Sequence, residues 1–414
     1  MIVKTCWRRV LRHTARRLLA VPSSGIRKFF DMARTYPDVI SLGAGEPDFT
    51  TPQHVIDAGI AALKEGATHY TANLGDLDLR TVIAERLREE NQGDYAPNEV
   101  LVTAGSSEGL GIVLQTIVDP DEEVLVPDPS YVAYGPAIRL AGGVPVCIPT
   151  FQEDKWIPDA TAVKERITDR TKAMIIPSPC NPTGAVYPKD TIEKMADIAL
   201  DNDLFVLSDE IYDKIVYDGS VHTSIASLKG MRERAFVING FSKAYAMTGW
   251  RVGYLACPRE LMDEVLKIHQ YCAICAPAVS QRAAYAAITG PQDCVREMVK
   301  EYDRRRRMMV AELDKIDGVS CHMPPGTFYT FPSFKTLLKE KGEAIRGYLA
   351  GRGKVADSIS EQMMDFLFMS AHVVSVGGSF FGPCGDGHLR MSFATSYSKI
   401  VEAIQRIRES ISKI

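Results

Sequence analysis

The chain has 414 residues, enough to bury a large core in two domains or in one large domain with a smaller appendage. Hydrophobic residues make up 46% of the chain, charged residues 24%, and the formal net charge is −4. This near-neutral balance gives no electrostatic basis for binding nucleic acid or a membrane surface. No apolar run reaches the roughly 18 residues that a membrane span needs.

The first twenty residues are basic and contain no acidic residue, which is typical of a mitochondrial transit peptide, but they also lack serine. Their cations fit one face of a first helix equally well: Lys4, Arg8, Arg9, Arg12, Arg16 and Arg17. The nine cysteines show no metal-binding or disulfide spacing, which indicates a reducing compartment. We interpret the one Cys-x-x-Cys pair, Cys272 and Cys275, as packed helix residues. The expectation is a cytoplasmic protein without a bound metal.

From about residue 99, short runs rich in Val, Ile, Leu and Phe alternate with segments of helix length. The runs are apolar throughout, as expected of strands buried on both faces. Such alternation predicts a mostly parallel sheet with helices on both faces, whose ligands bind beyond the carboxyl ends of the strands. The predicted strands are 99–103, 123–126, 144–148, 172–176, 204–208, 235–239 and 252–256, with helices that include 107–118 and 188–202.

After about residue 290 the pattern changes. Residues 294–316 predict one long charged helix, and we interpret its run from Arg304 to Arg307 as a solvated helix face. The remainder alternates strands and helices on a smaller scale. The predicted fold is therefore α/β, with a large domain over residues 45–290 and a smaller α+β domain formed by residues 1–44 and 291–414.

Lys243 directly follows a predicted strand and is flanked by small residues. Partial desolvation there lowers the pKa of the amine and frees its neutral form for Schiff-base chemistry. Arg251, eight residues on, is placed to bind a phosphate bidentately. The whole string from Ser242 to Gly253 is far more specific than a lone lysine, which is usually solvated.

Asp209 ends another predicted strand, so its carboxylate is expected to be semi-buried and to need a cationic partner. A protonated pyridine nitrogen is such a partner, and Tyr212 is placed to bond the phenolic oxygen of the same ring. The alternative is that Asp209 caps a helix.

Two further loops follow strands. Asn181 lies between Pro179 and Pro182, where its amide can bond a ring oxygen and a carboxylate; a plain Asn-Pro turn is the alternative. Residues 103–109 run from a strand into a helix, and their N–H groups, hydroxyls and helix dipole form a phosphate cradle.

Together these strings resemble the class I aminotransferases of fold type I, from about Ser24 to Ile414, and most closely the branch of prokaryotic and archaeal aspartate and aromatic aminotransferases. Residues 41–49, 69–71 and 389–394 complete the motifs in the family's order. The resemblance implies pyridoxal 5'-phosphate as cofactor. It implies that Lys243 carries the cofactor and moves the substrate proton, that Asp209 pairs with the ring nitrogen, and that Asn181 and Tyr212 hold the ring oxygen.

The resemblance also assigns the remaining ligands. Tyr131 stacks on the ring, and Arg390, helped by Asn181 and the backbone of Gly45, binds the substrate α-carboxylate; without the family, Arg390 would be interpreted as a surface arginine at a strand edge. The phosphate site comprises Gly105, Ser106, Ser107 and Arg251, with Tyr70 from a second subunit of a homodimer and Ser242 as a candidate substitute for a serine that many relatives have at the place of Gly240.

Two other departures from the family concern specificity and length. Ser107 stands where some bacterial aspartate enzymes have a lysine, which weakens a strictly aspartate-specific interpretation. Residues 335–369 are roughly twenty residues longer than usual, and such length is best tolerated in loops.

The implied activity is ping-pong transfer of the amino group of an L-amino acid (aspartate, aromatic or both) to a 2-oxo acid such as 2-oxoglutarate. A pyridoxal-phosphate β-lyase or a racemase-like enzyme on the same scaffold is the alternative. A regulator with an aminotransferase-like sensor domain would need an N-terminal DNA-binding domain, for which about 24 residues before the first motif are too few.

Overall fold

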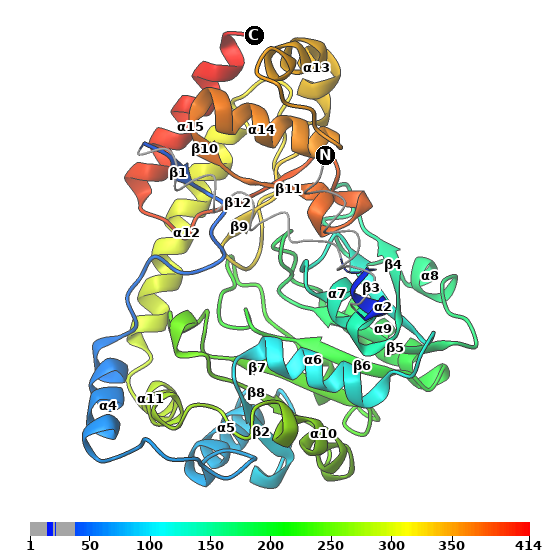
Figure 1. The fold of residues 1–414 in the computed structure, drawn as a ribbon, viewed down its shortest axis with the longest axis vertical. Helices are drawn as coiled ribbons and strands as arrows, with labels where there is room; N and C mark the ends of the chain where they lie inside the picture. The colour runs from blue at the N-terminus through cyan, green and yellow to red at the C-terminus, as the bar shows by residue number, and fades with distance from the viewer. Residues whose placement is uncertain (1–14, 20, 22–37) are drawn as a thin grey trace, which may run out of the picture.

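The computed structural model describes residues 15–19, 21 and 38–414. Its central sheet has seven strands in the order β2-β8-β7-β6-β5-β3-β4 (Figure 1). Neighbours are parallel except around β8, which is antiparallel to β2 and β7. All seven predicted strands are confirmed within two residues at each end: β2 (Val100–Thr103), β3 (Glu123–Asp128), β4 (Val144–Pro149), β5 (Thr171–Pro177), β6 (Phe205–Asp209), β7 (Ala235–Gly240) and β8 (Gly253–Ala256).

Helices cover both faces of this sheet, as predicted. Successive strand residues point to opposite faces, so Val100 and Val102 of β2 belong to one hydrophobic cluster and Leu101 to another. The first cluster includes side chains of α5 (Leu77–Glu89), α9 (Lys189–Asp201) and α11 (Ala278–Thr289). The second includes those of α6 (Ser106–Ile117), α7 (Tyr134–Ala141) and α10 (Arg259–Cys272). The strands are apolar throughout because both of their faces are buried.

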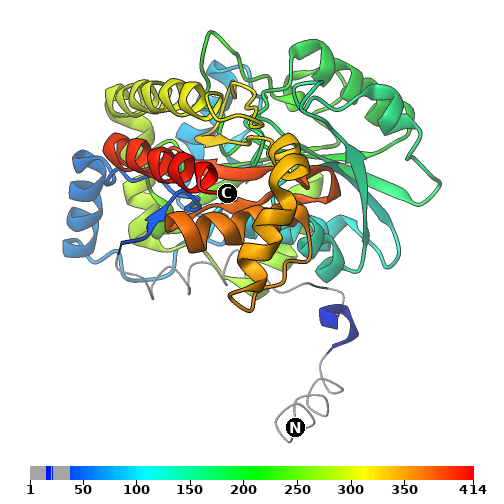
Figure 2. The same ribbon diagram turned by 90° about the horizontal axis from the view of Figure 1, so that it is seen from above.

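A third hydrophobic cluster holds the C-terminal part together with the segment around Ile40. In Figure 1 this part lies above the seven-stranded sheet, and Figure 2 looks down onto it. Its strands are short: β1 (Ile40–Ser41) pairs with β10 (Val373–Val374), and β12 (Leu389–Ser392) lies between β11 (Val376–Gly377) and β9 (Tyr329–Thr330). The domain boundaries at residues 45 and 290 stay a prediction.

The helices of this part include α12 (Asp293–Leu313), which confirms the predicted long helix, and α15 (Tyr397–Ser412). The segment expected to hold extra loop length is instead largely helical, as α13 (Lys335–Ala350) and α14 (Ile359–Ala371). Their apolar faces are buried in the third cluster, which explains why the segment is not a loop. The remaining helices are α2 (Arg16–Leu19), α4 (Gln53–Lys64) and α8 (Ala160–Lys164), with 3-10 turns at Pro97–Glu99, Ile225–Ser227, Thr248–Trp250, Gly378–Phe381 and Pro383–Gly385.

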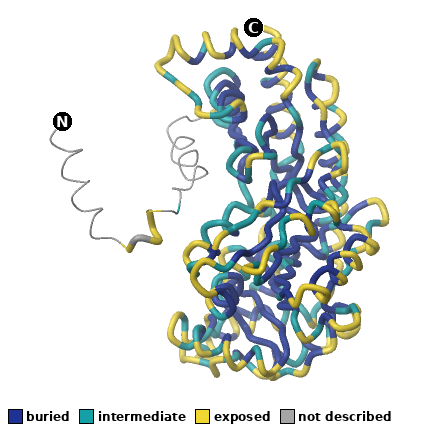
Figure 3. Tube along the Cα trace, turned by 90° about the vertical axis from the view of Figure 1, so that its right-hand side faces the viewer, coloured by how far each residue is buried: buried dark blue, intermediate teal, exposed yellow. Residues whose placement is uncertain are grey.

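The arginine run on α12 is not a solvated face, so that interpretation was wrong for half of it. Consecutive helix residues point in different directions, and Arg306 is fully buried while Arg304 is exposed. Figure 3 shows buried and exposed residues interspersed along the chain. The Arg306 guanidinium donates to Asp218 at 2.7 Å and to Asp303 at 2.5 Å. A buried cation is stable here because carboxylates satisfy it.

Within the described residues no helix is long and apolar enough to cross a bilayer. The eight described cysteines are free thiols. Cys272 is exposed at the end of α10, so its interpretation as a packed residue was wrong, whereas Cys275 is half-buried. The predictions on Lys4, Arg8, Arg9 and Arg12 lie outside the described residues.

Candidate active site

Five strands deliver predicted site residues to one edge of the sheet. The strands that end at this edge are β2, β3, β5, β6 and β7. A polar or aromatic side chain stands at the end of each strand or within a few residues after it. These side chains line a cavity of about 480 Å³, a size typical of small-molecule sites. The predicted residues that line it are Gly45, Ser106, Ser107, Tyr131, Asn181, Asp209, Tyr212, Ser242, Lys243, Arg251 and Arg390.

Lys243 places its amine inside this cavity. Its Nζ donates a hydrogen bond to the carbonyl oxygen of Gly45 at 2.6 Å. Burial lowers the pKa of the amine to about 8, with a further contribution from the positive charge of Arg390. The neutral, nucleophilic form is therefore far more populated near neutral pH than in an ordinary lysine.

Asp209 ends β6 as a half-buried carboxylate, as predicted. Its Oδ2 accepts a hydrogen bond from the Tyr134 hydroxyl at 2.6 Å, and its Oδ1 accepts one from the backbone N–H of Ile211 at 3.3 Å. Burial raises the pKa of Asp209 in spite of these bonds. No helix follows β6 in the described chain until the 3-10 turn at Ile225–Ser227, so the helix-cap alternative is wrong.

Tyr212 lies on the same side of the cavity. Its hydroxyl is 3.1 Å from that of Tyr329, and both rings are buried. Burial raises the pKa of Tyr212 well above its usual value, so its hydroxyl stays protonated and can donate a hydrogen bond.

Arg390 reaches the cavity from β12, the central strand of its small sheet, and is 3% exposed. Its Nη1 donates to Asn181 Oδ1 at 3.1 Å and its Nη2 to the carbonyl oxygen of Gly43 at 2.8 Å. Its buried Nε has no hydrogen-bond partner in the described structure. The interpretation of Arg390 as a surface arginine was therefore wrong. A buried guanidinium with an unused donor is suited to bind a carboxylate.

Gly105 and Arg251 meet at the N-terminus of α6. Gly105 has φ +86°, and a Cβ at this position would lie 2.6 Å from Arg251 Nη2. Glycine thus allows the guanidinium to lie across the first turn of the helix, where the N–H groups and the dipole favour an anion. Gly105 itself does not line the cavity.

Gly240 faces the neighbouring strand closely. A Cβ at Gly240 would lie 2.9 Å from the Cα of Gly253, so a serine there would require β7 and β8 to move apart. This contact gives a physical reason for the missing serine. Ser242 lines the cavity and is 7% exposed.

Tyr70 lies away from the cavity and is 79% exposed. Sequence reasoning did not assign roles to Tyr134 and Tyr329, which line the cavity and bond Asp209 and Tyr212. The only signal for Tyr134 was its place three residues after Tyr131, one helical turn on.

Residues 37–407 match the family described as aminotransferase class I and II. The chain is 42% identical over 396 residues to an aspartate aminotransferase of Pyrococcus abyssi (strain GE5 / Orsay), covering 95% of this chain and 97% of that one. It is 40% identical over 400 residues to aromatic-amino-acid aminotransferase 2 of Thermococcus litoralis, covering 96% and 98%. The crystal structure of an aromatic aminotransferase from Pyrococcus horikoshii OT3 superposes with a TM-score of 0.84 at 40% identity, covering 93% and 98%.

The sheet and its carboxyl-edge cavity are those of a fold type I enzyme, as in these solved structures. The chain belongs to the aminotransferase class I and II family. It is accordingly a transaminase that depends on pyridoxal 5'-phosphate, and none of the relatives described above is a β-lyase.

The residues present fit this cofactor. Asp209 is a half-buried carboxylate with no ion-pair partner among the described residues, which suits a protonated ring nitrogen. Gly105 and Arg251 leave an anion site at the start of α6, which suits the phosphate. The amine of Lys243 lies in the same cavity, which suits the aldehyde.

Proposed function

We propose that this enzyme transfers the amino group of aspartate and of aromatic L-amino acids to a 2-oxo acid such as 2-oxoglutarate in a ping-pong cycle. The observation that carries the proposal is the pairing, across one cavity, of a lysine with a pKa of about 8 and an arginine with an unused donor. Relatives named for aspartate and for aromatic amino acids support both substrate classes.

In this proposal the cofactor, when bound, supplies an electron sink for the negative charge that develops at the substrate Cα. Lys243 would hold the cofactor through Nζ, and its neutral amine would act as the base that moves the proton of the substrate Cα. Its low pKa suits both tasks, because the neutral amine is the nucleophile and the base.

The other residues orient the reactants. Asp209, fixed by Tyr134, keeps the ring nitrogen protonated, while Tyr212 and Asn181 hold the ring oxygen. Tyr131 packs on the ring. Arg390 binds the substrate α-carboxylate bidentately, assisted by Asn181 and the backbone of Gly45.

The phosphate is held by Gly105, Ser106, Ser107, Ser242 and Arg251. These residues surround the N-terminus of α6, where backbone N–H groups and the helix dipole favour an anion.

The role of Lys243 is tested by absorbance. Purified protein should show a visible band and, after borohydride treatment, a stable covalent link to the cofactor. Lys243→Ala should lack both the link and the activity. A fully active, covalently labelled Lys243→Ala protein would exclude this lysine. Activity that depends on an added 2-oxo acid distinguishes transamination from β-elimination.

Substrate scope follows from the lining of the cavity. Ser107 lines it in place of a lysine, beside Tyr131, so both aromatic and acidic donors should be accepted. Gly25, which we expect near the entrance, lies outside the described residues. A panel of donors assayed against 2-oxoglutarate tests the scope: turnover of aspartate and glutamate with phenylalanine and tyrosine inert would contradict it.

We also propose a homodimer in which Tyr70 completes the phosphate site of the other subunit. Tyr70 lies between α4 and α5, and Leu63, Leu77 and Tyr271 nearby are also more than half exposed. Asn73 Nδ2 donates to the carbonyl oxygen of Ile274 at 2.8 Å, which brings the α10–α11 loop beside this segment. A symmetric dimer is the commonest closed assembly.

Subunit exchange tests the sharing of sites. A hybrid of Lys243→Ala and Tyr70→Ala chains has one intact site if Tyr70 serves the neighbour, so cofactor affinity should recover relative to the Tyr70→Ala dimer. No recovery in proven hybrids would mean that Tyr70 serves its own subunit.

The location and the domain division are further parts of the proposal. The free thiols of the eight described cysteines support a reducing cytoplasm. The third hydrophobic cluster, most of whose members come from the C-terminal part and the segment around Ile40, supports a small domain formed by residues 1–44 and 291–414, beside a large domain over residues 45–290. The cluster also includes side chains of the large domain, among them Ile211 and Tyr217, which pack the two parts together.

A further inference from the structure

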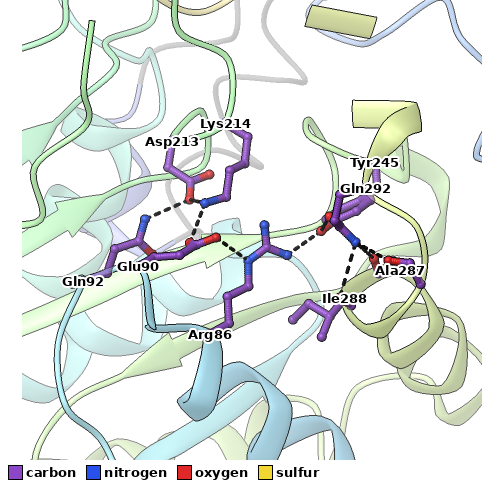
Figure 4. A network of polar contacts seen from close by, with 10 residues as sticks. Arg86, Glu90, Gln92, Asp213, Lys214, Tyr245, Ala287, Ile288 and Gln292 are labelled. Carbon is purple, nitrogen blue, oxygen red and sulfur yellow. Dashed lines mark hydrogen bonds and ion pairs between the residues drawn. The ribbon is translucent and has the colours of Figure 1, made fainter. Parts of the chain in front are cut away.

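A polar cluster lies between α5, the loop after β6 and the junction of α11 with α12 (Figure 4). Arg86 of α5 donates to the hydroxyl of Tyr245 and pairs with Glu90 at 3.1 Å. The Tyr245 hydroxyl in turn donates to Gln292 Oε1 at 2.7 Å. Gln292 Nε2 donates to three backbone carbonyl oxygens at the end of α11: Ala287 at 2.9 Å, Ile288 at 3.3 Å and Gly290 at 2.7 Å.

Tyr245 connects this cluster to the cavity, because it lies two residues after Lys243 in one compact turn. The N–H of Tyr245 donates to the carbonyl oxygen of Phe241 at 3.3 Å. The next residue, Ala246, has φ +51°, a left-handed conformation that is unfavourable for an L-residue. Such a turn persists only if its surroundings hold it. The Thr51 hydroxyl holds it by donating to the carbonyl oxygen of Ala246 at 2.7 Å, and Tyr245 holds it through Arg86 and Gln292.

A second branch of the cluster reaches the segment after β6, which contains Tyr212. Glu90 also pairs with Lys214, and Lys214 lies 3.4 Å from Asp213. Gln92 Nε2 donates to Asp213 at 3.1 Å. Asp213 directly follows Tyr212, so one network contacts two of the segments that supply cavity residues, those of Tyr212 and Lys243 (Figure 4).

We propose that Arg86 and Tyr245 are positioning residues, which hold the turn of Lys243 so that Nζ stays against the carbonyl oxygen of Gly45. The inference rests on the proposed role of Lys243. Neither Arg86 nor Tyr245 lines the cavity, so they act by fixing the backbone from which Nζ reaches it.

Loosening the turn has a measurable consequence for the amine. Burial is the main cause of the low pKa of Lys243, so an amine that moves toward water should regain a pKa nearer 10.5. The charged groups that face Lys243 from the packed elements are otherwise unchanged by substitutions at Arg86 or Tyr245: Glu46, Asp209, Arg251 and Arg390.

The test measures how fast cofactor-free protein captures added pyridoxal phosphate as a function of pH, followed by absorbance. The midpoint of the pH profile reports the pKa of the attacking amine. Arg86→Met and Tyr245→Phe should each raise the midpoint by about one pH unit and slow capture near pH 7 by about tenfold. Arg88→Met is the matched control: Arg88 lies on the same helix in an exposed pair with Asp94 at 2.7 Å, and its variant should behave as wild type.

A double variant shows whether the two residues act as one unit. If they do, Arg86→Met with Tyr245→Phe should shift the midpoint no more than either single change. The proposal is overturned if folded Tyr245→Phe protein keeps the midpoint of Arg88→Met. Tyr245→Phe keeps the buried ring and removes only the hydroxyl. This variant therefore tests the positioning role even if Arg86→Met fails to fold. Covalent capture by Lys243→Ala, run in parallel, would instead refute the lysine assignment.

Discussion

The two sides of the cavity are built in different ways. One side, which we name the sheet wall, consists of residues just beyond the carboxyl ends of the large sheet, such as Ser106, Asp209 and Lys243. The other, the closing wall, consists of Gly43, Gly45, Tyr329 and Arg390, which come from three segments far apart in the sequence. Strand register fixes the sheet wall, whereas the closing wall forms only when the chain ends are brought together.

This difference separates their tasks. The sheet wall carries the groups suited to the cofactor; Asp209 is anchored within this wall by Tyr134, whereas Lys243 donates across the cavity to the carbonyl oxygen of Gly45. The closing wall carries the guanidinium suited to the substrate carboxylate, anchored across the cavity to Asn181. Damage to the sheet wall should therefore lower kcat, and damage to the closing wall should mainly raise KM.

The largest expected effect is on the sheet wall. Asp209→Asn keeps the shape of the side chain but removes its charge, so the ring nitrogen loses the partner that keeps it protonated. We expect kcat to fall by at least about 10³-fold, or about 4 kcal/mol, with weaker cofactor binding. Steady-state kinetics at saturating cofactor measure this, and near-native turnover would show that another group holds the nitrogen.

On the closing wall, Arg390→Lys keeps the charge but loses the planar pair of donors. We expect kcat/KM to fall by about 10²-fold, roughly 3 kcal/mol, chiefly through KM for both amino and 2-oxo acids. If kcat fell alone, with KM unchanged, Arg390 would belong functionally to the sheet wall.

Lys243 should make the cofactor-free protein less stable. Its pKa in the fold, about 8, is below the unfolded value of 10.5, so folding is opposed wherever the lysine is charged. At roughly 1.4 kcal/mol for each pH unit, the difference amounts to about 3 kcal/mol. This destabilisation is fully present below pH 8 and disappears as the pH rises from 8 to 10.5.

Urea unfolding of cofactor-free Lys243→Met protein tests whether Lys243 lowers the free energy of unfolding. At pH 7 the variant should be more stable than wild type by about 3 kcal/mol, and its advantage should shrink at higher pH. A variant equal to or less stable than wild type at pH 7 would mean that the amine is well solvated.

The smallest effect is expected for Tyr134→Phe, which removes one hydrogen bond to Asp209. A hydrogen bond to a charged group contributes roughly 1.5–3 kcal/mol. Because the backbone N–H of Ile211 still bonds Asp209, we expect the lower end of this range, a fall in kcat of about tenfold. The control is Tyr95→Phe, because the buried Tyr95 hydroxyl has no hydrogen-bond partner in the described structure. Equal losses in both variants would point to packing rather than to Asp209.

The same contrast explains what the sequence could predict. The seven strands could be predicted because each is an uninterrupted apolar run. Asp209 and Lys243 could be predicted as site residues because each adjoins such a run. Roles for Tyr134 and Tyr329 are not, since a tyrosine within a helix or a two-residue strand has no local signature. The burial of Arg306 also escaped prediction, because its partner Asp218 is 88 residues away. These features depend on contacts between residues far apart in the sequence, which local sequence patterns do not encode.

Because Arg390 lies late in the sequence, the ribosome synthesises the sheet wall before it synthesises Arg390. β8 ends at Ala256, and Arg390 follows 134 residues later. At roughly 5–20 residues per second, the ribosome takes roughly 7 to 27 s to cover that stretch. For this interval a nascent chain already contains Lys243 and Asp209 but not the segment that shields them. Stalling or truncation between these two points leaves Lys243 without Arg390 and without the full burial that lowers its pKa, so its amine stays mostly protonated near neutral pH until the segment arrives.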